Sequence, residues 1–159
     1  MGSSSKEKAA FTRALTVARR FLLAAEYHYL FTPADMDFSG AIVLFTKAFE
    51  HSLKGALRPL EKRIQNVIKS DNAPGQKPFA KYTLGQVHGL LKAHPTELKS
   101  MLGEIGLDYD RVSSSVRQIN EEAPAKHLAS KSKADATRFR SLILGSSSVI
   151  SALFRPEQA

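Results

Sequence analysis

The sequence predicts an all-α protein: an antiparallel helical bundle with two long helices, two short helices and two C-terminal helices of moderate length. Apolar residues recur at spacings of three and four along most of the chain, which is the period of an amphipathic helix. No segment alternates between apolar and polar residues for long enough to indicate a strand. The connections are short, so successive helices should be antiparallel neighbours.

The first long helix is predicted from a stripe that runs over residues 11–29. Pro33 disfavours helical backbone at Thr32, so the helix should end there. The stripe consists of Phe11, Leu15, Ala18, Leu22, Ala25 and Tyr29.

The second long helix covers roughly residues 39–70, and Asp37 or Ser39 is placed to cap its start. Pro59 lies within the helical pattern and has no amide to donate to the carbonyl of Gly55, which predicts a kink or a short break near residues 55–59. Its apolar face consists of Ile42, Phe45, Phe49, Leu53, Ala56, Leu60, Ile64 and Val67.

Two short helices are expected after a loop that is rich in proline, glycine and asparagine. Thr83 and Gln86 have the spacing of a capping box, which predicts that a helix begins at residue 84. Pro95 should begin the next helix, and Gly106 should end it.

The two C-terminal helices complete the expected bundle. The first carries Val112, Val116 and Ile119 at helical spacing. The second should begin near residues 132–135 and run to about residue 153, with Pro156 beyond its end. Its inner stripe consists of Phe139, Ile143, Ser146, Ile150 and Leu153.

The 159 residues suffice for one domain with a single core. We expect a disordered terminus or expression-vector remnant over residues 1–8, one helical domain over residues 9–155, and a tail over residues 156–159. No apolar run approaches the ~20 residues that a membrane-spanning helix needs. The chain has no cysteine, which excludes disulfides and zinc–thiolate sites and fits a cytoplasmic protein.

The net charge of +8 favours an anionic partner, either nucleic acid or an acidic protein surface. A basic but merely solvated surface is the alternative. The five histidines form no metal-ligand pattern with carboxylates, and no glycine-rich phosphate loop or serine nucleophile motif is present, so we predict no metal and no cofactor. His51 and His88 are expected to be partly buried histidines of the bundle.

The segment "QINEEAPAKHL", residues 118–128, is the candidate functional site. A polar helix ends at Pro124, and His127 follows among cations. A histidine near a helix N-terminus and basic residues can contact a phosphate, whereas a soluble linker between two helices is the alternative. The candidate RNA-binding residues are Arg117, Asn120, Lys126, Lys131, Lys133, Arg138 and Arg140.

Four stretches, in this order, resemble bacterial HEPN domains (higher eukaryotes and prokaryotes nucleotide-binding). They are "DFSGAIVLFTKAFEHSLKGAL", "YTLGQVHGLL", "INEEAPAKH" and "ADATRFRSLILGSSSVISALF", and the resemblance covers roughly residues 10–154. It rests on the lysine–alanine–x–glutamate stretch at residues 47–50, on the threonine–leucine–glycine–glutamine turn at 83–86, and on the motif histidine. The resemblance implies an all-α bundle, a homodimer and, in active members, a metal-independent ribonuclease used in antiviral defence.

In that resemblance His127 matches the motif histidine, and Pro124 and Ala125 match its proline and one alanine. The motif arginine falls on Glu122, whose negative charge would repel a phosphate. We therefore predict a non-catalytic module for RNA binding, protein interaction or dimerisation. Two alternatives stay open: a ribonuclease that uses His127 with Arg117 or Lys126, and a basic helical scaffold subunit of a larger complex.

Overall fold

The computed structural model describes residues 5–122, 130–145 and 149–153, and the side chains of these except at 5–14, 151 and 152. Helices account for all of the regular structure in these ranges, and no strand occurs there, which confirms the predicted fold class. In chain order the elements are α1 (Ser5–Phe31), α2 (Ser39–Leu57), η1 (Arg58–Leu60), α3 (Glu61–Ser70), η2 (Phe79–Lys81), α4 (Leu84–Ala93), α5 (Pro95–Glu104), α6 (Tyr109–Glu122), α7 (Lys133–Leu144) and η4 (Val149–Leu153).

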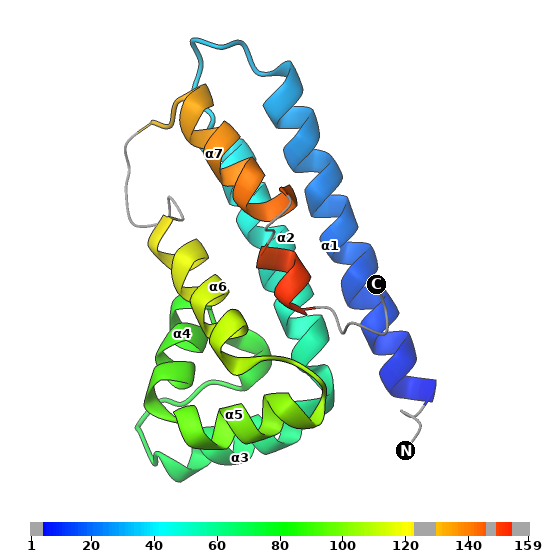
Figure 1. Cartoon of the computed structure of the whole chain (residues 1–159), viewed down its shortest axis with the longest axis vertical. Helices are drawn as coiled ribbons and strands as arrows, with labels where there is room; N and C mark the ends of the chain where they lie inside the picture. Colours follow the sequence, from blue (N-terminus) through cyan, green and yellow to red (C-terminus); the bar gives the residue numbers. More distant parts are fainter. Residues whose placement is uncertain (1–4, 123–129, 146–148, 154–159) are drawn as a thin grey trace.

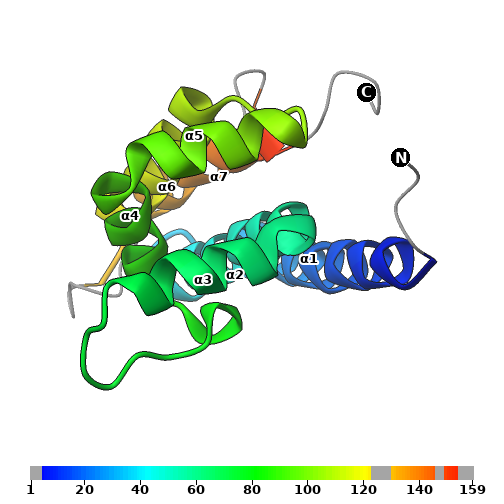
Figure 2. The same ribbon diagram turned by 90° about the horizontal axis from the view of Figure 1, so that it is seen from below.

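The long helices α1 and α2 lie side by side and antiparallel (Figure 1). Viewed from below, α1, α2 and α3 form one layer, and α4 to α7 form a second layer against it (Figure 2). The helix α1 begins at Ser5, so residues 5–8, expected in the terminal segment, belong to it. It ends at Phe31, two residues before Pro33, as the proline predicts.

The predicted break in the second long helix is present. α2 ends at Leu57, a short 3-10 turn follows, and α3 continues from Glu61 in a new direction (Figure 1). Pro59 occupies this turn, where it supplies no amide to the helical ladder. At the other end of α2, the N-cap residue is Phe38, which makes no side-chain cap hydrogen bond, so the prediction of Asp37 or Ser39 at this position is wrong. Asp37, one residue earlier, accepts a hydrogen bond from the amide of Ser39 at 3.1 Å.

The predicted starts of α4 and α7 are confirmed. Thr83 and Gln86 form the reciprocal hydrogen bonds of a capping box at the start of α4. Ser132 and Asp135 form a second capping box, and α7 begins at the next residue, Lys133. Gly106 follows α5 with a φ of 76°, the left-handed conformation that glycine adopts without strain.

The expectation of one continuous C-terminal helix to about residue 153 is wrong. α7 ends at Leu144, and a separate 3-10 helix, η4, covers Val149–Leu153. Gly145 and the three serines that follow it all have lower helix propensity than alanine or leucine. A Cβ atom at Gly145 would lie only 2.3 Å from the carbonyl oxygen of Ser141, so this helix end requires glycine.

The predicted stripes meet in one hydrophobic core. Phe45, Phe49 and Leu53 of α2 are completely buried. The core also includes Ala25 of α1, Ile64 and Ile68 of α3, Val112, Val116 and Ile119 of α6, Phe139 and Ile143 of α7, and Leu153 of η4. One core that joins all these helices holds both layers together.

Candidate functional site

The segment predicted to hold the site joins α6 to α7. α6 ends at Glu122, and the predicted site residues Lys126 and His127 lie outside the described residues. The structure places the other predicted residues on α6, at the entry to α7, and on α7 itself. Glu122 on α6 and Ser130 before α7 are the described residues on either side of this segment.

On α6, Arg117 is exposed, whereas Asn120 is half-buried against the start of α4. A Cβ atom at Gly85 would lie 3.3 Å from Oδ1 of Asn120, so a larger residue at position 85 would require a small shift of the Asn120 side chain. The carboxylate of Glu122 lies 3.9 Å from the guanidinium of Arg138 on α7. Glu122, which the resemblance aligns with the motif arginine, therefore pairs with a cation of this same chain.

The start of the basic tract is held by backbone contacts. The amide of Lys131 donates to Asp37 at 2.8 Å, and its carbonyl accepts from the amide of Phe38 at 2.9 Å. The hydroxyl of Ser39 also donates to Asp37. This hydroxyl, followed by the amides of Lys131 and Ser39, keeps the pKa of Asp37 below its ordinary value. The chain entering α7 is thus tied to the chain entering α2.

Further along α7, a group of side chains connects this helix to α1, and we call it the α1–α7 clamp. Arg140 donates to both carboxylate oxygens of Glu26, at 2.5 and 2.9 Å. This bidentate contact raises the pKa of Arg140 above its ordinary value. The ring of Tyr29 lies 5.2 Å from the Arg140 guanidinium and 5.9 Å from the Lys133 ammonium, and its hydroxyl is 2.8 Å from that of Thr137.

These contacts bear on the predicted RNA-binding residues. Lys133, Arg138 and Arg140 each engage a partner within the chain, and Arg140 does so through two charge-assisted hydrogen bonds. A phosphate would have to compete with Glu26 for Arg140. The exposed fractions differ accordingly, at 71% for the side chain of Arg138 and 39% for that of Arg140. RNA binding by the tract stays a prediction.

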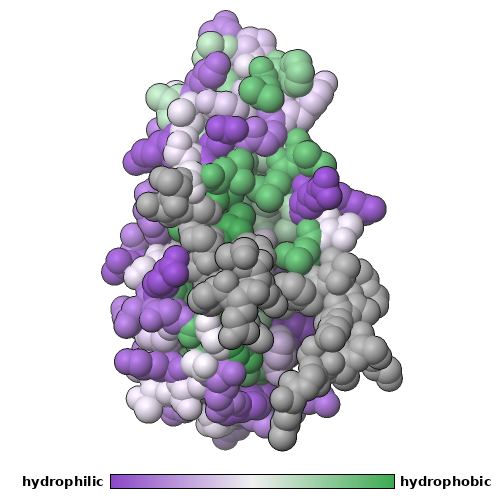
Figure 3. Space-filling model, turned by 45° about the vertical axis from the view of Figure 1, so that its right-hand side comes forward, coloured by the Kyte–Doolittle hydropathy of each residue, from purple (hydrophilic) through white to green (hydrophobic). Residues whose placement is uncertain are grey.

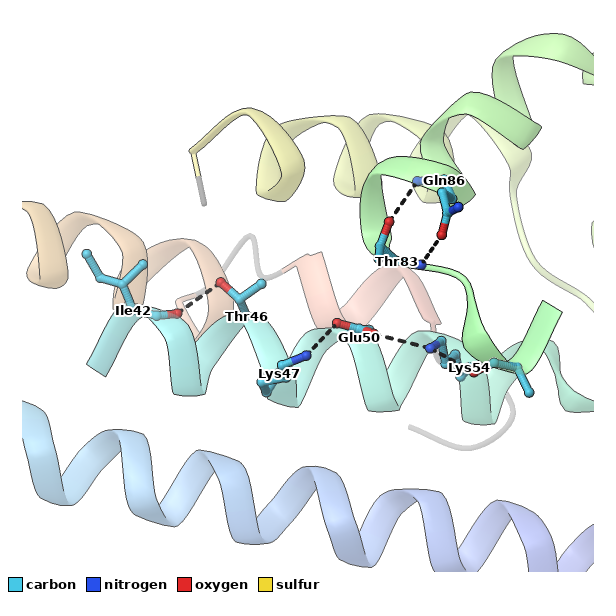
Figure 4. A network of polar contacts seen from close by, with 8 residues as sticks. Ile42, Thr46, Lys47, Glu50, Lys54, Thr83 and Gln86 are labelled. Carbon is cyan, nitrogen blue, oxygen red and sulfur yellow. Dashed lines mark hydrogen bonds and ion pairs between the residues drawn. The ribbon is translucent and has the colours of Figure 1, made fainter. Parts of the chain in front are cut away.

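The residues that carry the resemblance on α2 and α4 form a second polar group (Figure 4). Glu50 accepts from Lys47 at 3.4 Å and from Lys54 at 3.2 Å, and Lys54 also donates to the carbonyl of Ala80 at 3.1 Å. The capping box of α4 lies next to this group (Figure 4). These contacts join η2 to α2 and fix the start of α4, which are structural roles.

His51 is half-buried, and its ring stacks on that of Phe21 with the centroids 5.1 Å apart. Burial lowers the pKa of His51 below its ordinary value, and the charges of Lys54 and Lys47 act in the same direction, against that of Glu50. The predicted role as a partly buried bundle histidine is confirmed. His88 is also half-buried, as predicted.

The structure reveals an apolar surface that the sequence interpretation missed. Four large side chains of α1 lie on the side of the helix opposite the buried Ala18 and Ala25, and we call them the outer stripe. They are Leu23, Tyr27, Leu30 and Phe31, with exposed fractions of 62, 65, 64 and 69%. Figure 3 shows hydrophobic residues at the upper end of the face on which α1 comes forward.

A signal for this surface was present in the sequence. Residues 23, 27, 30 and 31 have the spacing i, i+4, i+7 and i+8, which is a second apolar face in addition to the one assigned to the core. Tyr27 and Phe31 also contact one another, with ring centroids 4.7 Å apart. Of these two apolar faces, the described residues cover only the inner one.

Comparisons of the chain with protein-family models, with curated proteins and with solved structures found no match. Among the described side chains, no group of three histidine, cysteine, aspartate or glutamate residues could hold a metal ion. The search of the same residues for a membrane span found no helix of sufficient length and apolarity.

Proposed function

We propose that this chain is a HEPN-like helical module that acts by binding another protein chain and does not cleave RNA. The outer stripe is the observation that carries the proposal. Its four large apolar side chains are each more than 60% exposed and lie on one face of one helix. Contiguous exposed apolar surface of this kind marks interaction sites in proteins that are otherwise well packed.

The polar contacts near the motif segment favour binding over cleavage. A metal-independent ribonuclease needs a histidine to move a proton and a cation to stabilise the phosphate as its charge grows. At the motif-arginine position Glu122 offers the opposite charge, and it pairs with Arg138. Arg140, the other arginine of α7, is held by Glu26. Cleavage would have to recruit a cation from elsewhere.

Site-specific photocrosslinking in the cells that produce the protein tests the binding function. A benzoylphenylalanine at position 27 samples the outer stripe, and the same residue at position 62, an exposed lysine of α3, is the matched control. We expect a light-dependent protein adduct from position 27 and none from position 62. Equal or absent adducts at the two positions would contradict the proposal.

An RNA cleavage assay tests the non-catalytic part. Labelled single-stranded RNA is incubated in EDTA with the wild type, Glu122→Arg and His127→Ala. We expect no turnover by the wild type, because the position that the resemblance assigns to the phosphate-holding arginine carries Glu122, which supplies no positive charge. Efficient cleavage by the wild type that His127→Ala abolishes would establish the ribonuclease alternative instead.

A further inference from the structure

We infer that the outer stripe, together with the two arginines that precede it on α1, receives an acidic amphipathic helix of the partner protein. This inference rests on the proposed function and names the chemistry of the partner. Apolar side chains alone would accept almost any apolar surface. Arg19 and Arg20 narrow the choice, because they extend the same face of α1 toward its N-terminus.

The two arginines lie in line with the apolar side chains. Residues eleven positions apart are about three turns apart, and so lie on the same side of a helix. Leu30 follows Arg19 at this spacing, and Phe31 follows Arg20. Each of the two rows therefore begins with a cation and continues with apolar side chains, with Leu23 in the first row and Tyr27 in the second.

Both arginines are accessible to a partner. They are exposed, and no carboxylate among the described side chains pairs with either of them. Four arginines elsewhere in the described part of the chain do have such a partner: Arg58 with Glu61, Arg63 with Glu104, Arg138 with Glu122, and Arg140 with Glu26. A carboxylate of the partner can thus reach Arg19 and Arg20 without displacing another one.

The charge also disfavours a partner that is only apolar. A segment that covers the outer stripe removes water from its surroundings, which include the two guanidinium groups. Taking a cation out of water is unfavourable unless an anion pairs with it. Acidic residues at one end of the partner segment meet this requirement, while apolar residues at its other end cover the outer stripe.

The length and area of the surface fit a single helix. Residues 19–31 extend about 18 Å along α1, at about 1.5 Å per residue. The four side chains of the outer stripe offer on the order of 100 Å² each, well below the ~800 Å² that each side of a standard interface buries. The described residues include no strand to which an extended segment could add, so a helix that presents apolar anchors is the mode that fits.

Two other occupants fit this surface less well. A second copy would present the same face of α1, where the neighbouring acid, Glu26, is already held by Arg140. Nucleic acid would pair with the arginines, but its bases stack on aromatic rings, and half of the outer stripe is leucine.

Mapping the adduct formed at position 27 tests the chemistry of the partner directly. The photocrosslinked product is isolated from the cells and digested, and the attached peptide is identified by mass spectrometry. We expect a peptide of a different protein in which acidic residues flank apolar residues spaced three and four apart. A neutral or basic peptide, a peptide of this same chain, or an attached nucleotide would overturn the inference.

Charge reversal tests the role of the arginines. Arg19→Glu with Arg20→Glu should lower the yield of the position-27 adduct at least about fivefold, as expected from the loss of two exposed ion pairs and the new repulsion. Lys62→Glu with Lys69→Glu is the matched control, because it changes the net charge equally at exposed positions of α3. Equal losses from the two double variants would overturn the inference, since they would reflect net charge alone.

A selection with the purified full chain provides a test outside the cell. Displayed random peptides of about 16 residues, long enough for about four helical turns, are depleted on the Leu30→Lys variant and then selected on the wild type. The retained peptides should be acidic and amphipathic, and their affinity should fall at least about tenfold in Leu30→Lys. Leu144→Lys, at an exposed leucine of α7, should leave the affinity unchanged.

Salt dependence completes this test. Binding of the retained peptides should weaken as salt is raised to about 0.5 M, because exposed ion pairs are then screened. Retained peptides without acidic residues, or with an affinity that salt does not change, would overturn the inference. Thermal unfolding of each variant, expected to match the wild type, shows that a loss of binding does not reflect unfolding.

The outcomes separate this inference from the proposed function. If position 27 crosslinks to a different protein through a neutral or basic segment, the binding function stands and only the chemistry of the partner is wrong. If position 27 crosslinks to nothing, both fail.

Discussion

Arg140 offers the sharpest test of how the basic tract is used. If it belongs to the α1–α7 clamp, Arg140→Met should destabilise the fold and leave RNA affinity almost unchanged. Methionine preserves the apolar stem but removes the charge and the hydrogen bonds to Glu26. Arg138→Met is a matched control, because it removes the same charge from the same helix, where the contact to Glu122 is long, at 3.9 Å.

The expected contribution of the Arg140–Glu26 pair to stability depends on how exposed the two side chains are. Exposed ion pairs contribute about 0.2–1 kcal/mol, and hydrogen bonds to charged groups contribute about 1.5–3 kcal/mol where water is excluded. The side chains of Arg140 and Glu26 are 39% and 26% exposed, which places the pair between these limits and nearer the first. We expect a coupling of about 1 kcal/mol from the bidentate pair, and about 0.5 kcal/mol more from the contact with Tyr29.

The assay is urea unfolding of the wild type, Arg140→Met, Glu26→Gln and the double variant. Arg140→Met should lower the free energy of unfolding by about 1.5 kcal/mol and the melting temperature by about 3–6 °C. Arg138→Met should stay within about 0.5 kcal/mol of the wild type. Fluorescence anisotropy with labelled single-stranded RNA at low salt provides the functional comparison, in which Arg140→Met should lower affinity no more than Arg138→Met does.

A coupling below about 0.3 kcal/mol, the scatter expected for independent sites, would refute the clamp. The clamp would also be refuted if Arg140→Met lowered RNA affinity more than ten times as much as Arg138→Met does. Either result would show that Arg140 is available to a phosphate in solution. The RNA-binding prediction for the tract would then take precedence over the protein-binding proposal.

Three further predictions concern the fold. Phe49→Ala should cost about 3–5 kcal/mol in urea unfolding, because the side chain is completely buried; a loss under about 1 kcal/mol would contradict the single core. His51 has a lowered pKa in the folded state, so its protonation opposes folding: stability from this residue is complete above its ordinary pKa of 6.5 and falls as the pH drops below that value. His51→Gln should therefore reduce the loss of stability between pH 7.5 and 5.5, and an unchanged loss would assign the pH dependence to other groups. Ser132→Ala removes the acceptor for the amide of Asp135 and should cost about 1 kcal/mol, whereas the same change at the exposed Ser130 should cost much less; equal effects would argue against the cap.

Much of the fold follows from local chemistry in the sequence. The spacing of Ile42, Phe45, Phe49 and Leu53 predicts the buried face of α2, because one helical period relates these residues. The capping box at Thr83 and the break at Pro59 are equally local, since each involves backbone groups within four residues. Such features need no knowledge of the tertiary structure.

The candidate site was less predictable, because its contacts join residues far apart in the chain. Arg140 and Glu26 are 114 positions apart, and no spacing rule brings them together. The predicted RNA-binding role of the basic tract rests on the charges near His127 and on the resemblance, and neither shows which cations already have anionic partners. The outer stripe was missed for a different reason: one apolar face was sufficient to explain α1 as part of a bundle, so the second was left unassigned.

The cations that are already paired within the chain and the exposed apolar side chains of the outer stripe differ in what a binding partner must displace. A net charge of +8 counts every cation equally, yet several of them are already paired: Arg63 with Glu104, Lys47 and Lys54 with Glu50, and Arg140 with Glu26. An anion that binds a paired cation must first displace the carboxylate, which offsets much of the gain. A partner that covers the outer stripe displaces only water from Leu23, Leu30 and Phe31, which is favourable for apolar surface. The outer face of α1 is therefore the surface at which we propose that a partner binds, and its occupancy should be measured before any RNA affinity is assigned to α7.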